Sequence, residues 1–277
     1  MGYERRANPA LLFRDRERFL AHMTSGQRRK PANMAAIVAI NQGRKPLTRR
    51  VVPPVPLPPP RVAGLLEQGH TVLDTRSSEA FGAGHVAGAL HAHLSSSQFE
   101  QRAGWVVPVG ASVVLVTTRD ADVASCMANL AFVGMDQPVV GYLEGGMEAW
   151  IAHGLPVVAT PQISPDEAWA RLSTGEIRLL DVREQSEWDE GHAEGALFRP
   201  YHELIPREGA EAPGRDLMPT DGRPLAVVCA GGLRSSTAIS LLLRQGYSPL
   251  LNVTGGMDAW KKAGLPRVDA AGNACGR

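Results

Sequence analysis

The chain contains an internal repeat, which constrains its fold more than any other feature. The segment "TVLDTRSSEAFGAGHVAGAL", residues 71–90, aligns with "RLLDVREQSEWDEGHAEGAL", residues 178–197, and matches Asp74 with Asp181 at an offset of 107 (181 − 74). Further on, "LEGGMEAWIAHGLPV" aligns with "VTGGMDAWKKAGLPR" at an offset of 110 (253 − 143), so the second copy carries a net insertion of three residues. A long self-match of this kind indicates two copies of one domain.

Each copy contains short apolar strands that alternate with helices. In the second copy Ser164 is the expected N-cap of a helix, followed by Pro165 at the first helical position. Continuous apolar strands between helices are typical of a parallel sheet covered on both faces. The predicted fold class is α/β, with two tandem domains whose parallel sheets are flanked by helices, after a short and partly helical N-terminal segment. The predicted strands are 177–182, 225–229 and 249–253, and the predicted helices are 164–172, 235–247 and 257–264.

Changes in composition indicate the boundaries. "VVPPVPLPPPR" predicts an extended, fairly stiff spacer, and the small polar residues after Val268 predict a frayed end. We expect an N-terminal segment at 1–47, a proline-rich linker at 48–60, the first domain at 55–157, the second at 158–268 and a flexible tail at 269–277.

Charge and cysteine content argue against several classes of partner. The net charge is +1, so nothing indicates binding to nucleic acid or to an anionic membrane. No apolar run approaches the ~18 residues that span a bilayer, and the charged N-terminus does not resemble a signal peptide. Three widely spaced cysteines predict reduced thiols in a cytoplasmic protein. We expect no metal and no cofactor, and the sequence predicts no particular oligomeric state.

One of these cysteines lies in a loop suited to nucleophilic chemistry. In "VVCAGGLRSST", Cys229 directly follows a predicted strand, so its sulfur should lie at the carboxyl end of a parallel sheet, where such sheets bind ligands. Gly231 and Gly232 permit backbone conformations that turn N–H groups inward, and a following helix N-terminus adds partial positive charge. Arg234 adds a full charge, and together these groups should favour a thiolate. The alternative is an inert core cysteine, which the strand–loop–helix context disfavours.

Three motifs carry a resemblance to a known family. They are "LLDVREQSEWDEGHAEGA", "VVCAGGLRSS" and "VTGGMDAWKKAGLP". Over about residues 55–268 the chain resembles a tandem rhodanese, a sulfurtransferase. The resemblance implies that a cysteine thiolate takes the outer sulfur of a donor and that the resulting persulfide gives it to an acceptor thiol or cyanide. It implies Cys229 and Arg234 as catalytic residues, and a substrate cradle formed by Ala230, Gly231, Gly232, Leu233 and Ser235.

One departure from the family pattern concerns the donor. Many members carry a basic residue directly after the cysteine, which would help to bind the thiosulfate dianion, whereas this chain has Ala230. The substitution favours thiol-borne persulfides such as glutathione persulfide. A six-residue loop also argues against the related dual-specificity phosphatases, whose loop is one residue longer. A carrier or regulatory module that holds persulfide without turnover is the alternative function.

The first copy lacks the cysteine. Aligning the preceding strands matches Val116 with Val228, which puts Thr117 at the cysteine position and Asp122 at the position of Arg234. Threonine forms no thiolate at neutral pH, and the aspartate should repel an anion. We expect the first domain to be catalytically inactive and to pack against the second.

The N-terminal segment carries a separate resemblance. "GYERRANPAL", "FLAHMTSG" and "RKPANMAAIVAINQG" are similar to the C-terminal end of metallo-β-lactamase-fold hydrolases of the glyoxalase II and persulfide dioxygenase type. That family takes its metal ligands mainly from an upstream H-x-H-x-D-H motif, which is absent here; the nearest mimic is residues 91–93. This implies a truncated fusion with no dioxygenase or hydrolase activity of its own.

The remaining candidate residues have mainly structural interpretations. Asp181 should brace the loop together with Arg183, whose alternative role is direct contact with the substrate. His192 recurs as His85 in the inactive copy, which favours a structural hydrogen bond over acid–base catalysis. The other expectations are helix caps at Ser235, Ser236 and Thr237, a core position for Cys126, a spare exposed thiol at Cys275, and packing anchors at Trp150 and Trp260.

Overall fold

The computed structural model describes residues 7–25, 30–48, 50–206, 213, 215–217 and 222–275. The chain divides into two compact units, Met1–Lys30 and Pro31–Arg277. In the first unit, η1 (Pro9–Leu12) precedes α2 (Arg16–Thr24), and no residue of either helix is buried. The expectation of a partly helical N-terminal segment is therefore confirmed. Of the motifs that resemble metallo-β-lactamase-fold proteins, residues 2–6, 26 and 29 lie outside the described residues.

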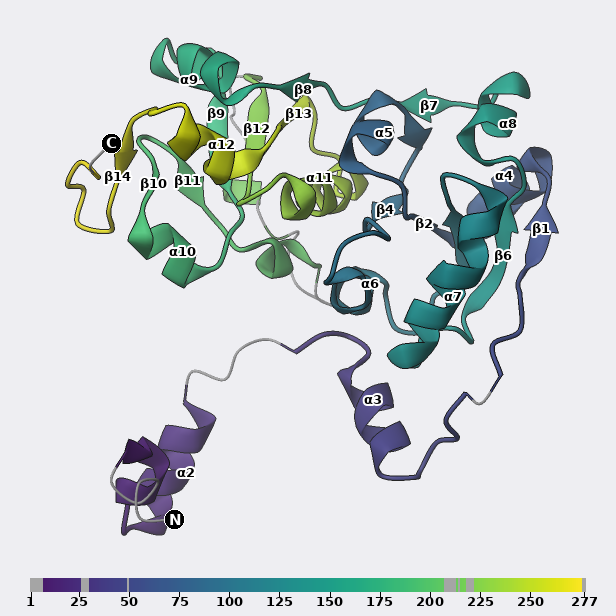
Figure 1. The fold of residues 1–277 in the computed structure, drawn as a ribbon, viewed down its shortest axis with the longest axis horizontal. Coiled ribbons are helices and arrows are strands. Elements are labelled where there is room, and N and C mark those ends of the chain that lie inside the picture. The colour runs from purple at the N-terminus through teal and green to yellow at the C-terminus, as the bar shows by residue number, and fades with distance from the viewer. Residues whose placement is uncertain are drawn as a thin grey trace. The chain divides into compact units, whose positions relative to one another are not determined.

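The second unit contains two five-stranded parallel sheets with equivalent strand orders (Figure 1). The order is β1-β6-β5-β2-β4 in the first sheet and β8-β13-β12-β9-β11 in the second. Val116 pairs with Asp74 in the first sheet, and Val228 pairs with Asp181 in the second, so the duplication extends to the register. This confirms the predicted fold class. The strands are β1 (Val55–Leu57), β2 (Thr71–Asp74), β4 (Leu90–His91), β5 (Val113–Val116), β6 (Val139–Leu143), β8 (Gln162–Ile163), β9 (Arg178–Asp181), β11 (Leu197–Phe198), β12 (Leu225–Val228) and β13 (Leu250–Val253).

Helices cover the sheets, and the central strands β2, β5, β12 and β13 are buried at every residue, as their continuous apolar sequences predict. Ser164 caps α9 as predicted, because its side chain accepts a hydrogen bond from the Glu167 amide at 3.1 Å. No helix among the described residues is long and apolar enough to cross a membrane. The α-helices of this unit are α3 (Met34–Asn41), α4 (Pro59–Glu67), α5 (Ser78–Ala83), α6 (Phe99–Val106), α7 (Val123–Phe132), α8 (Gly146–Ala152), α9 (Pro165–Ser173), α10 (Gln185–Glu190), α11 (Leu233–Arg244) and α12 (Gly256–Lys262), and the 3-10 helices are η2 (Asp120–Asp122), η3 (Tyr201–Leu204) and η4 (Arg215–Leu217).

The proline-rich stretch contributes to the first domain. Val55–Leu57 forms the edge strand β1, and Pro59 begins α4. Proline is tolerated on an edge strand and at the first turn of a helix because neither position needs its missing N–H. The last residues of the expected linker, 48–60, are therefore part of the first domain.

Two short antiparallel ribbons close the ends of the domains. They pair β3 (His85–Val86) with β7 (Val157–Val158), and β10 (His192–Ala193) with β14 (Arg267–Val268). Beside each ribbon a buried indole donates to a backbone carbonyl, from Trp150 to Pro156 at 2.9 Å and from Trp260 to Pro266 at 3.1 Å. These contacts confirm both tryptophans as packing anchors. The tail folds back as far as Cys275, whose amide donates to the Arg267 carbonyl at 2.9 Å.

Helix α11 joins the two domains. It packs on β12 and β13 of its own sheet and also contacts β4, α5 and α6 of the first domain (Figure 1). One cluster of buried apolar side chains includes residues of both domains. Hydrogen bonds also cross the boundary, among them one from the Ser78 hydroxyl to the Gly232 carbonyl at 3.3 Å and one from the His91 amide to the Ser240 hydroxyl at 3.1 Å. The loop at the start of α11 is therefore in direct contact with the first domain.

Candidate active site

Cys229 lies where the sequence predicts, directly after β12 at the carboxyl end of the second sheet. Its side chain is 1% exposed. The Gly232 amide donates to Sγ at 3.1 Å, and the thiol lies 3.6 Å from the Ser235 hydroxyl oxygen. The Gly232 amide is therefore one of the inward-facing N–H groups that the loop sequence predicts.

The loop ends in a glycine with a left-handed backbone. Gly232 has a φ of +91° and is the N-cap residue of α11, which begins at Leu233. A non-glycine residue would be strained here. The helix starts two residues before the predicted position, so Arg234 and Ser235 belong to its first turn and the partial positive charge of the helix N-terminus lies beside Cys229.

The early helix start also overturns the capping role expected of the three hydroxyl residues after Arg234. Ser235 and Ser236 donate to the Gly232 carbonyl at 3.0 and 3.5 Å, and Thr237 donates to the Leu233 carbonyl at 3.3 Å. They are donors within the first turns of the helix. No side chain caps α11, and the Gly232 N-cap leaves the amides at its start open to the loop.

Two glycines at the start of α12, Gly255 and Gly256, let this helix support the cysteine loop. The Met257 amide donates to the Cys229 carbonyl at 2.7 Å, and the Asp258 amide donates to the Ala230 carbonyl at 3.0 Å. Gly256 has a φ of +58°, and a Cβ there would overlap both carbonyl oxygens. The G-G-x-x-x-W motif therefore has a physical function, since only glycine lets the backbone of α12 approach the cysteine loop.

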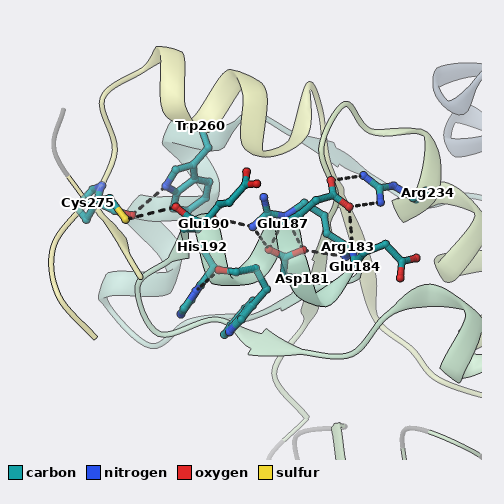
Figure 2. A network of polar contacts seen from close by, with 12 residues as sticks. Asp181, Arg183, Glu184, Glu187, Glu190, His192, Arg234, Trp260 and Cys275 are labelled. Carbon is teal, nitrogen blue, oxygen red and sulfur yellow. Dashed lines mark hydrogen bonds and ion pairs between the residues drawn. The ribbon is translucent and has the colours of Figure 1, made fainter. Parts of the chain in front are cut away.

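Arg234 is paired with a carboxylate that the sequence analysis missed. Its guanidinium donates to both oxygens of Glu187 on α10, at 2.5 and 2.7 Å, and Figure 2 shows this fork. Burial alone would raise the pKa of Glu187, but the hydrogen bonds from Arg234 and from the Glu184 amide outweigh it and lower the pKa. Burial alone would lower the pKa of Arg234, and the bonds to Glu187 and the charge of Cys229 raise it. Arg234 is therefore a fixed cation near the sulfur.

Asp181 and Arg183 form a separate buried pair. Arg183 donates hydrogen bonds to both carboxylate oxygens of Asp181, the shortest at 2.7 Å, and another to the Gly191 carbonyl at 2.9 Å (Figure 2). Asp74 and Arg76 make the same contacts in the copy without a cysteine. The contacts of Arg183 therefore favour bracing of the strand end, and its role as a substrate contact stays a prediction.

The two equivalent histidines also have matching surroundings. His192 lies against Trp188, with ring centroids 3.3 Å apart, and its Nδ1 is 3.1 Å from the Trp188 carbonyl. His85 lies in the same way against Phe81, at 3.8 Å, with Nδ1 2.8 Å from the Phe81 carbonyl. Because the arrangement recurs where the cysteine is absent, it favours a structural role for both.

The equivalent loop of the first domain has a different geometry. The Thr117 hydroxyl donates to the Arg119 carbonyl at 3.0 Å, and η2 replaces the glycine turn. Asp122 forms an ion pair with Arg119 at 2.7 Å, whose hydrogen bond lowers the pKa of the aspartate. Arg119 therefore offsets the negative charge through which we expected Asp122 to repel an anion, and that repulsion stays a prediction. The loop lacks both the thiol and the left-handed glycine of the second domain.

The other two cysteines have unlike environments. Cys126 is fully buried in α7, and burial raises its thiol pKa to about 12, which confirms the predicted core position. Cys275 is half-buried, and its sulfur lies 3.9 Å from the Glu190 carbonyl oxygen. Within the described part of the chain, no group of three or more His, Cys, Asp or Glu side chains could hold a metal ion.

Two further residues, which lie on elements that contact α11, were not predicted. Tyr201 of η3 is buried, and burial raises its pKa to about 12. Arg102 of α6 comes from the first domain and is 3% exposed. No spacing in either motif indicates them, because packing between the two copies brings Arg102 to the site and η3 lies in the region where the copies differ.

Comparison with known proteins agrees with this geometry. Residues 59–153 and 164–263 each match the family described as rhodanese-like domain. The chain belongs to this rhodanese-like family. A protein named Sulfurtransferase from Allochromatium vinosum is 36% identical over 112 residues, which are 40% of this chain and 97% of that relative. Two proteins named Thiosulfate sulfurtransferase GlpE, from Actinobacillus succinogenes and Coxiella burnetii, are each 31% identical, over 42% and 40% of this chain and 96% of each relative.

Proposed function

We propose that this rhodanese-like chain is a sulfurtransferase that carries sulfane sulfur on Cys229. The hydrogen bond from the Gly232 amide to Sγ, at 3.1 Å, carries the proposal, because an N–H group directed at the sulfur stabilises the thiolate that attacks the donor. The names of the relatives support transfer of sulfur from a small donor. Proposed donors are thiosulfate and thiol-borne persulfides such as glutathione persulfide, and the proposed acceptor is a thiol or cyanide.

The reaction has two balanced displacements. The Cys229 thiolate attacks the outer sulfur of the donor, a new S–S bond forms, and the electron pair of the old bond leaves on the donor remainder, which is sulfite when the donor is thiosulfate. An acceptor thiolate then attacks the outer sulfur of the Cys229 persulfide. The bond within the persulfide breaks, the acceptor becomes a persulfide, and the Cys229 thiolate is restored.

The groups around the cysteine sulfur would stabilise the negative charge that develops during the reaction. In the first displacement the persulfide anion places negative charge on a sulfur further from the backbone than Sγ. The N-terminus of α11 and the fixed Arg234 cation would stabilise this charge. Glu187 holds Arg234 by both oxygens and so acts as a positioning residue.

Steady-state sulfur transfer tests this function. Turnover should be measured with thiosulfate and with glutathione persulfide, for the unmodified chain and for the variants Cys229→Ser and Cys275→Ser. Cys229→Ser should lose transfer from both donors, because serine forms no persulfide, and Cys275→Ser should retain it. Full transfer by Cys229→Ser would refute the assignment.

We also propose that the first domain transfers no sulfur and that the segment before it derives from a metallo-β-lactamase-fold protein. Thr117 at the cysteine position supports the first proposal. Exposed apolar side chains in the N-terminal unit, including Leu11, Leu12 and Met23, support the second, since they would suit a larger parent domain. A measurement of persulfide oxygenation should find no activity above background.

A further inference from the structure

The first domain touches the cysteine loop directly. Ser78 at the start of α5 donates to the carbonyl of Gly232, the same residue whose amide binds the cysteine sulfur. On the neighbouring helix α6, Trp105 lies against His202 of the second domain, with ring centroids 5.2 Å apart. Helices α5 and α6 of the first domain therefore contact the elements that hold the cysteine loop.

Arg102 on α6 is buried but has few partners. Its side chain donates to the Ser96 hydroxyl, and its Nε is buried with no hydrogen-bond partner among the described residues. The Arg102 guanidinium forms no ion pair with a described carboxylate, in contrast to Arg76, Arg183 and Arg234. A guanidinium has five N–H donors, so Arg102 has donors left for a further acceptor, and an anion would also balance its charge.

Arg102 interacts electrostatically with Tyr201, Cys229 and Arg234 of the second domain. It also interacts with His91 and His93 of its own domain. Burial lowers the pKa of Arg102, while negative charge on Cys229 and Tyr201 raises it. Of these neighbours, Cys229 is the one whose sulfur the proposed reaction makes anionic, first as a thiolate and then as a persulfide.

We infer that Arg102 is a specificity-determining residue that the inactive first domain supplies to the active site of the second, where it attracts donors that carry a negative charge. This inference rests on the proposed function. Arg234 is already held by the carboxylate of Glu187, and Ala230 provides no charge after the cysteine. Arg102 is a cation without a carboxylate partner among the described residues, so it can pair with the sulfonate of thiosulfate.

Alkylation of Cys229 tests the inference without any sulfur transfer. Iodoacetate and iodoacetamide react with thiolates by the same displacement and are similar in size, but only iodoacetate is charged. The ratio of their rate constants at Cys229, followed by mass spectrometry of the peptide that contains it, reports the field that an incoming anion meets. Differences in thiol pKa and in access affect both reagents and cancel in the ratio.

The variants Arg102→Gln and Arg102→Met remove the charge and keep much of the side chain. Either one should lower the iodoacetate-to-iodoacetamide ratio by about three- to tenfold, the effect expected of one unit charge several ångströms away in a partly hydrated site. Arg102→Lys should keep most of the ratio. The matched control is Arg119→Gln, which removes an equal charge from an exposed ion pair of the same domain and should leave the ratio unchanged.

The outcomes separate this inference from the proposed function. The KM for thiosulfate should rise in Arg102→Gln more than the KM for an acceptor thiol. If the chain transferred no sulfur, the function would fail while the alkylation ratio could still change as expected. If a folded uncharged variant kept the ratio within twofold of the unmodified chain, the inference would be wrong even with sulfur transfer intact. Thermal unfolding identifies which of the two uncharged variants is folded.

Discussion

A pair of glycine substitutions isolates the contact that supports the cysteine loop. Gly146 and Gly256 are the first residues of the equivalent helices α8 and α12, and both have a φ of +58°. Alanine at either position should therefore cost about 1–2 kcal/mol for the left-handed backbone. The two sites differ in what the new methyl group meets. At Gly146 it lies 3.3 Å from the Thr117 carbonyl, whereas at Gly256 it overlaps the carbonyl oxygens of Cys229 and Ala230.

The difference between the variants can be worked out from the hydrogen bonds. Gly256→Ala must push α12 away from the loop, which breaks the bonds from Met257 to Cys229 and from Asp258 to Ala230. At about 1 kcal/mol for each bond, Gly256→Ala should lose about 2 kcal/mol more free energy of unfolding than Gly146→Ala. Sulfur transfer should fall sharply only in Gly256→Ala, because its loop no longer holds the sulfur in place.

Urea unfolding and steady-state sulfur transfer, measured on both variants, check this prediction. Equal losses of stability would show that α12 does not support the cysteine loop. A Gly256→Ala chain with normal transfer would show that the loop keeps its geometry without those two amides, and the account of the G-G-x-x-x-W motif would then be refuted.

Three other expectations concern charge and the inactive copy. Burial lowers the pKa of His91 from 6.5 to about 4, so only the unfolded chain gains this proton as the pH falls from 6.5 to 4. The free energy of unfolding, measured in urea, should therefore drop by about 3 kcal/mol over that window. A His91→Gln chain whose free energy of unfolding fell as steeply with pH would contradict this. Arg234→Ala should raise the barrier to sulfur transfer by about 1–3 kcal/mol. The kcat/KM of Arg234→Lys should lie between those of the unmodified chain and Arg234→Ala, because lysine keeps the charge but cannot form the fork with Glu187. Equal kcat/KM for both variants would count against the fork. Thr117→Cys combined with Cys229→Ser should transfer no sulfur in the same assay, and measurable turnover would show that the first loop is competent.

The architecture and the nucleophile could be predicted because local sequence determines them. The repeat implied two similar sheets, and the apolar runs after Ile177 and Pro224 became the central strands β9 and β12. Cys229 follows its strand directly, and the glycines after it can form only a few kinds of turn. These inferences depend only on interactions between residues close in sequence and on the alternation of strands with helices.

The rest of the site depends on contacts between distant segments. Glu187 and Arg234 are separated by 47 residues, and nothing in their spacing indicates that they meet. Arg102 reaches the site only because α6 packs against α11. The salt bridge of Asp122 was missed for another reason, since its charge was assessed without its neighbour Arg119. Charge at a loop position has meaning only once the partners of that charge are known.

The central claim is that Cys229 carries the transferred sulfur, and a single-turnover experiment with mass spectrometry tests it most directly. The chain should be mixed with one equivalent of thiosulfate or glutathione persulfide, digested after alkylation, and compared with a sample that then received an acceptor thiol. We expect one added sulfur atom on the peptide that contains Cys229, its loss when the acceptor is added, and no added sulfur on the peptides of Cys126 or Cys275. Added sulfur on another cysteine, or an unmodified Cys229 while the donor is consumed, would contradict the account.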